Sequence, residues 1–546
     1  MTERVATGLK RATITTCSRW SESYRIMGQP FPGPMSFQHH PWTRQMHDDE
    51  SPFVVGMKAA QMGFTNVCLN KTFFHIDVVG DSVLYVLPAS TPDATDFSTS
   101  RFDPALELSP HLRKLFSNVK NIGHKRAGSA SLFIRGSRSR SQMKSVPVAF
   151  IVLDEVDEMR QENISLVFER SSGQINKQSF LVSTPTINNY GIHEFFDVST
   201  QNHYFFKCPH CSRMTELTFP DSLVITSDDY KNPEIKKSHL ICPLPKCKKP
   251  LSQESKVDWL SLENAEWVEA HPGRMSVGYH IPQFYSMVIQ PWEIAVTYLK
   301  GLENPADEQE FYNSKLGMTH TPKGAKIDDD HITACTGTYT MPKSTPSPGI
   351  VTMGIDVGKW IHYEVDLYNF NPKATTPDIN TLSLCRLLHM GILEDFEDLD
   401  ELMFRYQIAS CVVDAEPETR KALEFARRFP GHVKLCHYGR GGATKNIAVH
   451  AESDCKITVD RTSWLDMSLG RFKTQTISLP VDLSLEYKQH IKANVRILEK
   501  NANGNIVAKY LKGNEPDHFA HARNYSEIAL PLASVTGKVQ NIVRVN

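Results

Sequence analysis

The strongest constraint on the fold is a set of short apolar runs between residues 52 and 202. They read VVG at 54–56, SVLYVLPAS at 82–90, VAFIVLDE at 148–155 and SFLVSTP at 179–185. Short apolar runs bounded by turn residues are typical of strands that are buried on both faces. Because helix-like stretches separate these runs, they predict an α/β fold with a mostly parallel sheet.

A second domain is expected because 546 residues exceed the size of one ordinary domain. The segment MPKSTPSPG at 341–349 carries three prolines and a glycine and is the best linker candidate. New strands begin directly after it, IVTMGIDVG and then HYEVDLYNF. CVVDAE follows at 411–416, and two strands around an Asn/Gly-rich turn are expected within 495–513. We therefore place a domain boundary near residue 345.

Charge and cysteine content exclude some classes of protein. A net charge of −1 argues against a generally basic nucleic-acid coat, although a local basic groove would still bind phosphates. Eleven cysteines, mostly scattered, do not fit a secreted disulfide framework. There is no apolar run of about 18–20 residues and no signal-peptide segment, so we expect a cytoplasmic protein without a membrane span.

The stretch VVGMKAAQMGFTN at 54–66 resembles a phosphate-binding loop between a strand and a helix. In the usual loop a lysine directly precedes the hydroxyl residue, whereas here Phe64 precedes Thr65 and Lys58 lies near the loop's start. Backbone N–H groups at the helix N-terminus would bind phosphates, Thr65 would ligate Mg²⁺, and Lys58 would reach the terminal phosphates. An ordinary strand–turn–helix has the same pattern, so this alternative stays open.

Asp154 and Glu155 end the apolar run VAFIVLDE. An Asp at this position suits Mg²⁺, and the adjacent Glu suits orientation and deprotonation of an attacking water. Ligands of open α/β sheets bind at the carboxyl ends of the strands, where these acids are expected. Ser183 and Thr184 end the next run and are candidates to contact a terminal phosphate. Acidic and polar exits from strands without any function would look the same.

Four cysteines form two short-loop pairs, Cys208-x-x-Cys211 and Cys242-x₄-Cys247. Four thiolates match the tetrahedral demand of a structural Zn²⁺ site without an open coordination position. His210 and His239 are alternative ligands, and four free thiols remain the simpler alternative.

Three aspartates in the second half come from separate predicted elements. Asp356 lies within the strand MGIDVG, Asp414 ends the strand SCVVD, and Asp517 begins a probable helix. A lone carboxylate on an apolar strand is costly to bury unless it is paired or binds a metal. Converging carboxylates are what two-metal phosphodiester hydrolysis needs, although each Asp alone also fits a turn or a helix cap.

The order VGMKAAQMGFT, VLYVLPAS, FIVLDEVDEM, VSTP and CPHC resembles the large terminase subunits of tailed bacteriophages, over roughly residues 40–530. In one branch of that family the phosphate-loop lysine is displaced toward the loop's start, as Lys58 is here. The resemblance implies an ATPase in which Lys58 and the loop around Gly56 and Gly63 contact the phosphates of ATP. It also implies that Thr65 and Asp154 serve Mg²⁺ and that Glu155 is the catalytic carboxylate. HPWTRQM at 40–46 resembles the family's adenine-side motif, which makes Trp42 and Arg44 candidates, although Thr43 stands where glutamine is usual. An arginine finger is also implied, with Arg101, Arg138 and Arg140 as candidates.

The second half, with its late DHxxxA-type helix, is similar to the ribonuclease-H-like nuclease of large terminases. The resemblance implies that Asp356, Asp414 and Asp517 bind Mg²⁺ or Mn²⁺, with Glu416, His518 and His521 as neighbours. It further implies double-stranded DNA, the portal protein and the small terminase subunit as partners, a homo-oligomeric ring during packaging, and the host cytoplasm as location.

The expected organisation has six segments. They are a lead-in at 1–50, a P-loop ATPase core at 51–202, a zinc-ribbon-like insertion at 203–260, the remaining ATPase domain and linker at 261–345, a ribonuclease-H-like nuclease at 346–530 and a tail at 531–546.

The expected function is DNA translocation driven by ATP, combined with cutting of concatemeric DNA. The main alternative is a ribonuclease-H-like recombinase or transposase with a zinc ribbon, which leaves the phosphate-loop and FIVLDEVDEM motifs unexplained. A docking protein with decayed sites and a helicase are further alternatives, but the acidic residues are intact and no second helicase-type motor domain follows the first.

Overall fold

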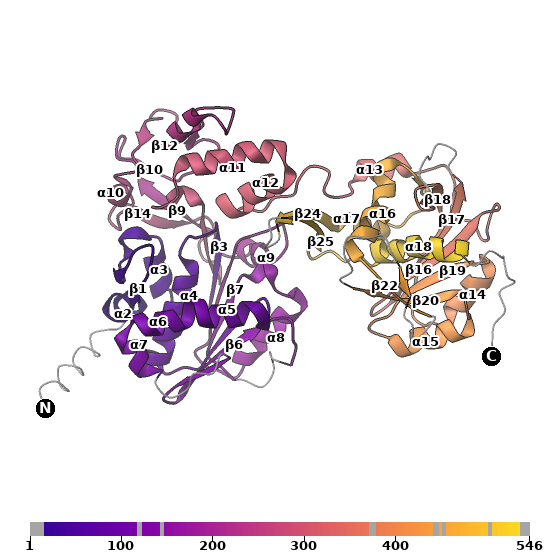
Figure 1. Ribbon diagram of the computed structural model, residues 1–546, viewed down its shortest axis with the longest axis horizontal. Helices are drawn as coiled ribbons and strands as arrows, with labels where there is room; N and C mark the ends of the chain where they lie inside the picture. Colours follow the sequence, from indigo (N-terminus) through magenta and orange to yellow (C-terminus); the bar gives the residue numbers. More distant parts are fainter. Residues whose placement is uncertain are drawn as a thin grey trace, which may run out of the picture. The chain divides into compact units, whose positions relative to one another are not determined.

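The computed structural model describes residues 16–116, 123–141, 143, 147–370, 378–439, 447–449, 455–500 and 505–535. The expected lead-in and tail fall partly outside these residues. The chain divides into two compact units, Met1–Thr321 and Pro322–Asn546 (Figure 1). No helix in the described ranges is long and apolar enough to cross a membrane.

The division falls after Thr321, whereas the proline-rich composition of residues 341–349 predicts a boundary near residue 345. The physical reason is that the residues after 321 pack within the second unit. Thr336 forms a bridge with Leu479, and the Tyr339 hydroxyl donates to the carbonyl of Leu387 at 2.8 Å.

The first unit is built on one large sheet, with strand order β10-β9-β15-β3-β8-β7-β4-β6-β5 and β14 paired to β9. Its strands are β3 (Phe53–Lys58), β4 (Val83–Leu87), β5 (His124–Ala127), β6 (Ala130–Gly136), β7 (Phe150–Asp154), β8 (Gln178–Ser183), β9 (Asn202–Lys207), β10 (Met214–Thr215), β14 (Ala265–Glu269) and β15 (Val277–Ile281). All neighbours from β9 to β6 are parallel. The expected α/β class and the four predicted strands are therefore confirmed.

Both faces of this sheet are buried, which explains the continuous apolar runs. Successive residues of one strand contribute to different hydrophobic clusters, as Val54 and Val55 do. The helices of this unit are α2 (Cys17–Tyr24), α3 (Thr43–Asp48), α4 (Phe64–Phe74), α5 (Thr95–Phe97), α6 (Asp103–Leu108), α7 (Pro110–Leu115), α8 (Ile164–Phe168), α9 (Ile192–Asp197), α10 (Lys256–Trp259), α11 (Pro291–Glu303) and α12 (Pro305–Glu310). A separate small sheet joins β11 (Leu223–Val224), β12 (His239–Ile241) and β13 (Pro250–Leu251), and β1 (Ile26–Met27) pairs with β2 (Gly33–Pro34).

The second unit has a mixed sheet of order β21-β22-β20-β19-β16-β17-β18-β23. Its strands are β16 (Ile350–Val357), β17 (Ile361–Phe370), β18 (Ser383–Leu393), β19 (Ser410–Asp414), β20 (Val433–Tyr438), β21 (Ala448–Val449), β22 (Lys456–Val459) and β23 (Ile477–Ser478). β16 to β18 are antiparallel, and β19, β20 and β22 continue parallel to β16. The predicted hairpin is confirmed as β24 (Asn494–Lys500) and β25 (Ile506–Lys512).

Helix α18 (His518–Val535) runs across β16 and β19 (Figure 1). A glycine is required at their contact, because a Cβ on Gly354 would lie 1.9 Å from the carbonyl oxygen of Ala522. This close approach brings the start of α18 near Asp356, two residues further along β16. The other helices of the unit are α13 (Asp329–Cys335), α14 (Asp398–Arg405), α15 (Thr419–Arg428), α16 (Arg461–Thr474) and α17 (Leu485–Lys492).

Candidate ATPase and nuclease sites

The loop between β3 and α4 is shaped by its two glycines. Gly63 has φ +84° just before α4, a left-handed conformation that favours glycine. A Cβ on Gly56 would lie 2.7 Å from the Phe64 ring, so this position also needs a glycine. Trp42 supports this loop, because its indole Nε1 donates a hydrogen bond to the carbonyl of Met62 at 2.9 Å.

Lys58 contacts two candidate polar residues, Glu155 after β7 and Thr184 after β8. It ends β3 and is only 5% exposed. Its Nζ lies 3.1 Å from Oε1 of Glu155 and donates to Oγ1 of Thr184 at 3.2 Å. These contacts place Lys58, Glu155 and Thr184 together at the carboxyl edge of the parallel sheet.

Asp154 is a buried acid without a full set of partners. It is 2% exposed, and its Oδ2 accepts a 2.6 Å hydrogen bond from the Tyr85 hydroxyl. Among the described residues, none forms a hydrogen bond with its Oδ1. Burial and the nearby Glu155 raise the pKa of Asp154 to about 6, against the opposing effects of Tyr85, Lys58 and Thr65. A buried carboxyl oxygen without a partner, beside a threonine hydroxyl, fits a divalent cation.

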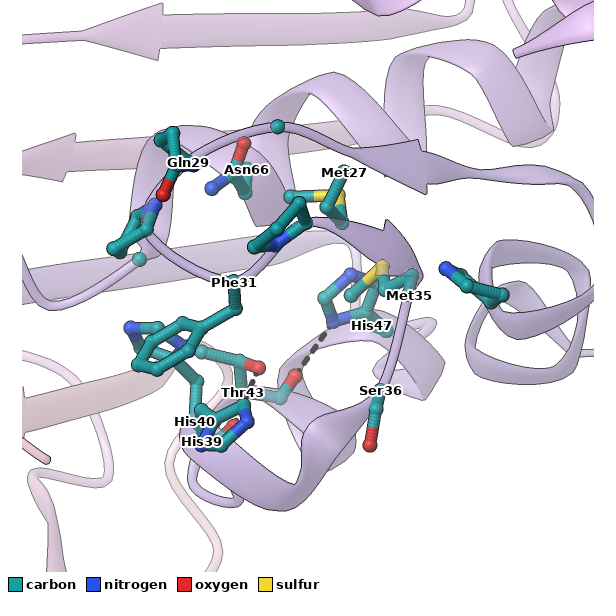
Figure 2. Close-up of a pocket in the computed structure, with 15 residues that line it drawn as sticks. Met27, Gln29, Phe31, Met35, Ser36, His39, His40, Thr43, His47 and Asn66 are labelled. Carbon is teal, nitrogen blue, oxygen red and sulfur yellow. Dashed lines mark hydrogen bonds between the residues drawn. The ribbon is translucent and has the colours of Figure 1, made fainter. Parts of the chain in front are cut away.

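A cavity of about 350 Å³ adjoins the start of α4 (Figure 2). Gly63 and Asn66 line it from the loop side, and residues 27–47 supply the remainder of its wall. Phe31 and His39 stack with ring centroids 3.8 Å apart at this cavity. Trp42 is 1% exposed and Arg44 is half-buried on α3, and neither side chain is part of the cavity lining.

The three candidate finger arginines are exposed. Arg101 lies in the segment Ser98–Phe102 after β4, while Arg138 and Arg140 follow β6. Their exposure leaves each of them accessible to a neighbouring molecule.

The four cysteines lie together, with their sulfur atoms all within 4.8 Å of one another. Cys208 follows β9 and Cys242 follows β12. In each pair the residue after the second cysteine, Ser212 or Lys248, has a positive φ, so the two loops turn in the same way. His210 and His239 bond instead to the carbonyls of Pro250 and Lys237, outside the sulfur cluster.

Asp356 and Asp414 lie at the ends of adjacent parallel strands. Ile355 of β16 pairs with Val413 of β19, so the two aspartates are the next residues on each strand. Asp356 is 7% exposed, while Asp414 is half-buried. Burial raises the pKa of Asp414 to about 6, and the charge of Asp356 adds to this rise. The exposed Glu416 contributes a backbone N–H to Oδ1 of Asp414 at 3.1 Å.

Asp517 is buried among cations at the start of α18. Its carboxylate contacts Nζ of Lys512 at 2.7 Å, Nε2 of His521 at 3.1 Å and the guanidinium of Arg461 at 3.9 Å. Burial alone would raise its pKa, but the contacts with His521 and Lys512 hold the pKa well below its usual range. The sequence did not identify Lys512 and Arg461 as site residues, because only folding brings them to Asp517.

His518 links the helix to the nuclease strand. Its Nδ1 lies 2.8 Å from Oδ2 of Asp356, and this hydrogen bond raises the pKa of the imidazole. Within the described residues, the three aspartates do not form one cluster with ligand atoms inside 4.8 Å; Asp356 instead groups with His362 and His518.

Two family models match the chain in order. The model of the phage terminase large subunit gpA ATPase domain matches residues 30–267, and that of the terminase large subunit gpA endonuclease domain matches residues 276–380. The second match begins within the first structural unit and ends after β17 of the second. None of the curated proteins matches the chain.

Solved structures of large terminases are also similar. The HK97 bacteriophage large terminase is 10% identical, with a TM-score of 0.48 over 94% of this chain and 98% of that chain. The large terminase of a thermophilic bacteriophage, in complex with ADP, is 10% identical, with a TM-score of 0.30 over 90% of this chain and 96% of that one. The large terminase nuclease of thermophilic phage G20c is 12% identical, with a TM-score of 0.23 over 36% of this chain and 94% of that one. At these values the family models carry the assignment. Because both models describe one subunit and together match well over half of the sequence, the chain belongs to the family of phage terminase large subunits, with an ATPase domain and an endonuclease domain.

Proposed function

We propose that ATP is hydrolysed at the carboxyl edge of β3, β7 and β8. Phosphates would bind the loop after Lys58 and the N-terminus of α4. Thr65 and Asp154 would hold Mg²⁺, which would neutralise the phosphate charge. Glu155 would orient and deprotonate the attacking water once the phosphates compete with it for Lys58.

The nucleotide base is assigned to the cavity beside Gly63. Its position next to the first turn of α4 and its aromatic wall at Phe31 and His39 suit a base. Trp42 would act indirectly, because its indole supports the loop at Met62. A contact from Arg44 would require that side chain to turn toward the base.

DNA cutting is assigned to the edge where β16, β19 and α18 meet. Asp356, Asp414 and Asp517 would hold divalent ions, Mg²⁺ or Mn²⁺, that activate water and stabilise the leaving oxygen. Asp414 supports this assignment, because burial and the charge of Asp356 raise its pKa, and a bound cation would offset both effects. To bind an ion, Asp517 would have to give up its contact with Lys512 or with His521. His518 and His521 would position the two acids they contact.

The cysteine cluster is assigned to one structural Zn²⁺ held by Cys208, Cys211, Cys242 and Cys247. Four sulfur atoms within 4.8 Å and two similarly turned loops support it. All four positions would be filled by protein, so the ion would stabilise the insertion rather than take part in chemistry.

The partners follow from a packaging role. Double-stranded DNA would be moved into a procapsid through contacts with phosphates that do not depend on sequence. The portal protein and the small subunit would be the protein partners, in the host cytoplasm. In a ring of identical subunits, one of Arg101, Arg138 and Arg140 would reach a neighbour's ATP.

Two observations support this proposal. In the first unit, Lys58 contacts Glu155, and the adjacent Asp154 has a carboxyl oxygen without a hydrogen bond among the described residues. In the second unit, Asp356 and Asp414 lie at the ends of adjacent strands. The test follows ATP turnover and DNA cleavage in the same tubes with Mg²⁺ or Mn²⁺. Glu155→Gln should lower turnover by about 10²–10⁴-fold and leave nucleotide binding intact. Asp356→Asn should lower cleavage by about 10³-fold and spare turnover.

Two outcomes would contradict the assignments. Normal turnover in Glu155→Gln would remove Glu155 from its catalytic role, and continued cutting by Asp356→Asn would remove Asp356 from the nuclease site. Cleavage without any ATP turnover, even with DNA and partner proteins added, would favour the recombinase alternative.

A further inference from the structure

A second group of metal-ligating side chains lies beside the nuclease aspartates. His362 comes from β17, and Glu486 and His490 come from α17. Glu486 and His490 are four residues apart, so they share one face of the helix. The ligand atoms of all three residues lie within 4.8 Å of one another.

The spacing of these atoms is too long for hydrogen bonds. Oε1 of Glu486 lies 4.0 Å from Nε2 of His362 and 3.9 Å from Nε2 of His490. Direct hydrogen bonds would need about 2.7–3.2 Å. Ligands about 2.0–2.1 Å from a shared tetrahedral ion lie about 3.4 Å apart. The two distances from Glu486 to the histidines would therefore have to shorten by only about 0.5–0.6 Å for the three residues to share one ion.

The surroundings suit a site with one open position. The side chains of His362 and His490 are 5% and 4% exposed, while that of Glu486 is 49% exposed. All three line a cavity of about 490 Å³. Two buried imidazoles and an open carboxylate would leave room for water as the fourth ligand.

We propose that His362, Glu486 and His490 bind a transition-metal ion of the Zn²⁺ class, at a site separate from the nuclease aspartates. Imidazole ligands suit Zn²⁺, Ni²⁺ and Cu²⁺, whereas sites made of carboxylates alone suit Mg²⁺ and Mn²⁺. The two neighbouring sites therefore select different ions. This inference goes beyond the proposed function, because it needs neither ATP hydrolysis nor DNA cutting.

The site lies next to the nuclease through one ring contact. His518 stacks on His362, with ring centroids 4.5 Å apart, and also bonds to Asp356. An ion that fixes His362 would fix the ring against which His518 packs and would tie α17 to β17. The ion is therefore a structural support at the edge of the nuclease site. Asp356, His362 and His518 form the competing ligand group, which the test must separate.

The test measures zinc bound to the full chain after equilibrium dialysis against Zn²⁺ alone. The wild type should hold one ion that survives replacement of Cys208 and Cys211 by Ser. Glu486→Gln and His490→Ala should each lower the affinity for that ion by more than about 100-fold. The control is His331→Ala, because His331 lies on α13 and bonds to Asp328, so that variant should keep the ion.

Cobalt substitution gives a second readout. Co²⁺ in the cysteine site should show sulfur-to-metal charge transfer, while the ion at His362, Glu486 and His490 should not. If His490→Ala fails to fold, Glu486→Gln still decides, because that side chain is half exposed. Absence of any cysteine-independent zinc would overturn the proposal. So would an ion lost in Asp356→Asn but retained in both Glu486→Gln and His490→Ala.

Discussion

The two units treat their buried acids differently. In the first unit, Asp154 and Asp157 are buried, and burial is the main cause that raises their pKa values to about 6 and about 7. In the second unit, Asp517 contacts Lys512 and His521. Three further buried acids of this unit, Glu364, Asp366 and Glu527, contact two buried arginines, Arg471 and Arg523.

Among the described residues, Asp154 and Asp157 form no ion pair, whereas Asp517 and Glu527 contact cationic side chains. Asp154 lies at the end of a strand, where an incoming ion can replace the missing partner. Glu527 is instead a structural acid: burial would raise its pKa, but Arg471 and Arg523 lower the pKa to about 2. In the second unit, burial also raises the pKa of Asp414 to about 6, and it raises the pKa values of Glu364 and Asp366 although both contact Arg523. Among the proposed ion ligands, Asp154 and Asp414 are thus the acids whose pKa burial raises, whereas Asp517 already has cations beside it.

The largest effect is expected when a compensating arginine is removed. Arg523 is fully buried and contacts Glu364, Asp366 and Glu527. Arg523→Met should lower the free energy of unfolding of the second unit by about 3–5 kcal/mol, because it leaves buried carboxylates uncompensated. Urea unfolding with hydrogen exchange in α18 would measure the loss.

Arg420→Met is the matched control for this variant, since that side chain is 87% exposed. It should change the free energy of unfolding by no more than about 0.5 kcal/mol. Equal effects of the two substitutions would show that compensation within the second unit does not matter for its stability.

An intermediate effect is expected for Asp154→Asn, in the opposite direction. Because the folded pKa of about 6 exceeds the ordinary value of 3.8, the stability associated with the protonated carboxyl is present below about pH 4. It is lost as pH rises through about 6. Asn cannot ionise, so the nucleotide-free variant should gain at most about 3 kcal/mol over the wild type at pH 8 and little at pH 4.

Thermal unfolding of the two proteins at pH 4 and pH 8 would measure this gain, and the variant should also lose Mg²⁺-dependent ATP turnover. A stability difference that stays constant between the two pH values would show that Asp154 is not the uncompensated acid described above.

The smallest effect is expected for Lys512→Met, which removes one partner of Asp517. Lys512 is 46% exposed, so its ion pair is worth no more than about 1 kcal/mol. If Asp517 binds an ion, the Mg²⁺ concentration for half-maximal DNA cleavage should fall, by less than about fivefold. Lys509→Met on the same strand is the control, because Lys509 pairs with Glu499 instead. A higher Mg²⁺ requirement in Lys512→Met would mean that Lys512 helps to form the site.

Local patterns were sufficient for the elements and for most candidate residues. Four apolar runs predicted the strands β3, β4, β7 and β8, because a strand buried on both faces must be apolar throughout. Lys58 and Asp154 lie at strand ends, and parallel strands bring such ends to one edge of the sheet. Cysteine spacing likewise indicated the sulfur cluster.

Other features depend on contacts between residues far apart in the sequence. The boundary after Thr321 could not be predicted from composition, because the segment after it packs against Leu387 and Leu479. Lys512 and Arg461 gave no local signal, since only folding places them near Asp517.

The sequence by itself determined where the main strands lie along the chain and which acids and cysteines are available for chemistry, because burial and metal binding restrict residue type and spacing locally. Only the tertiary structure decided which acids have cations beside them, which leave an oxygen without a partner, and that His362 meets Glu486 and His490. Electrostatic compensation depends on distances of a few ångströms between residues that can be more than a hundred positions apart, and only the packed chain fixes those distances.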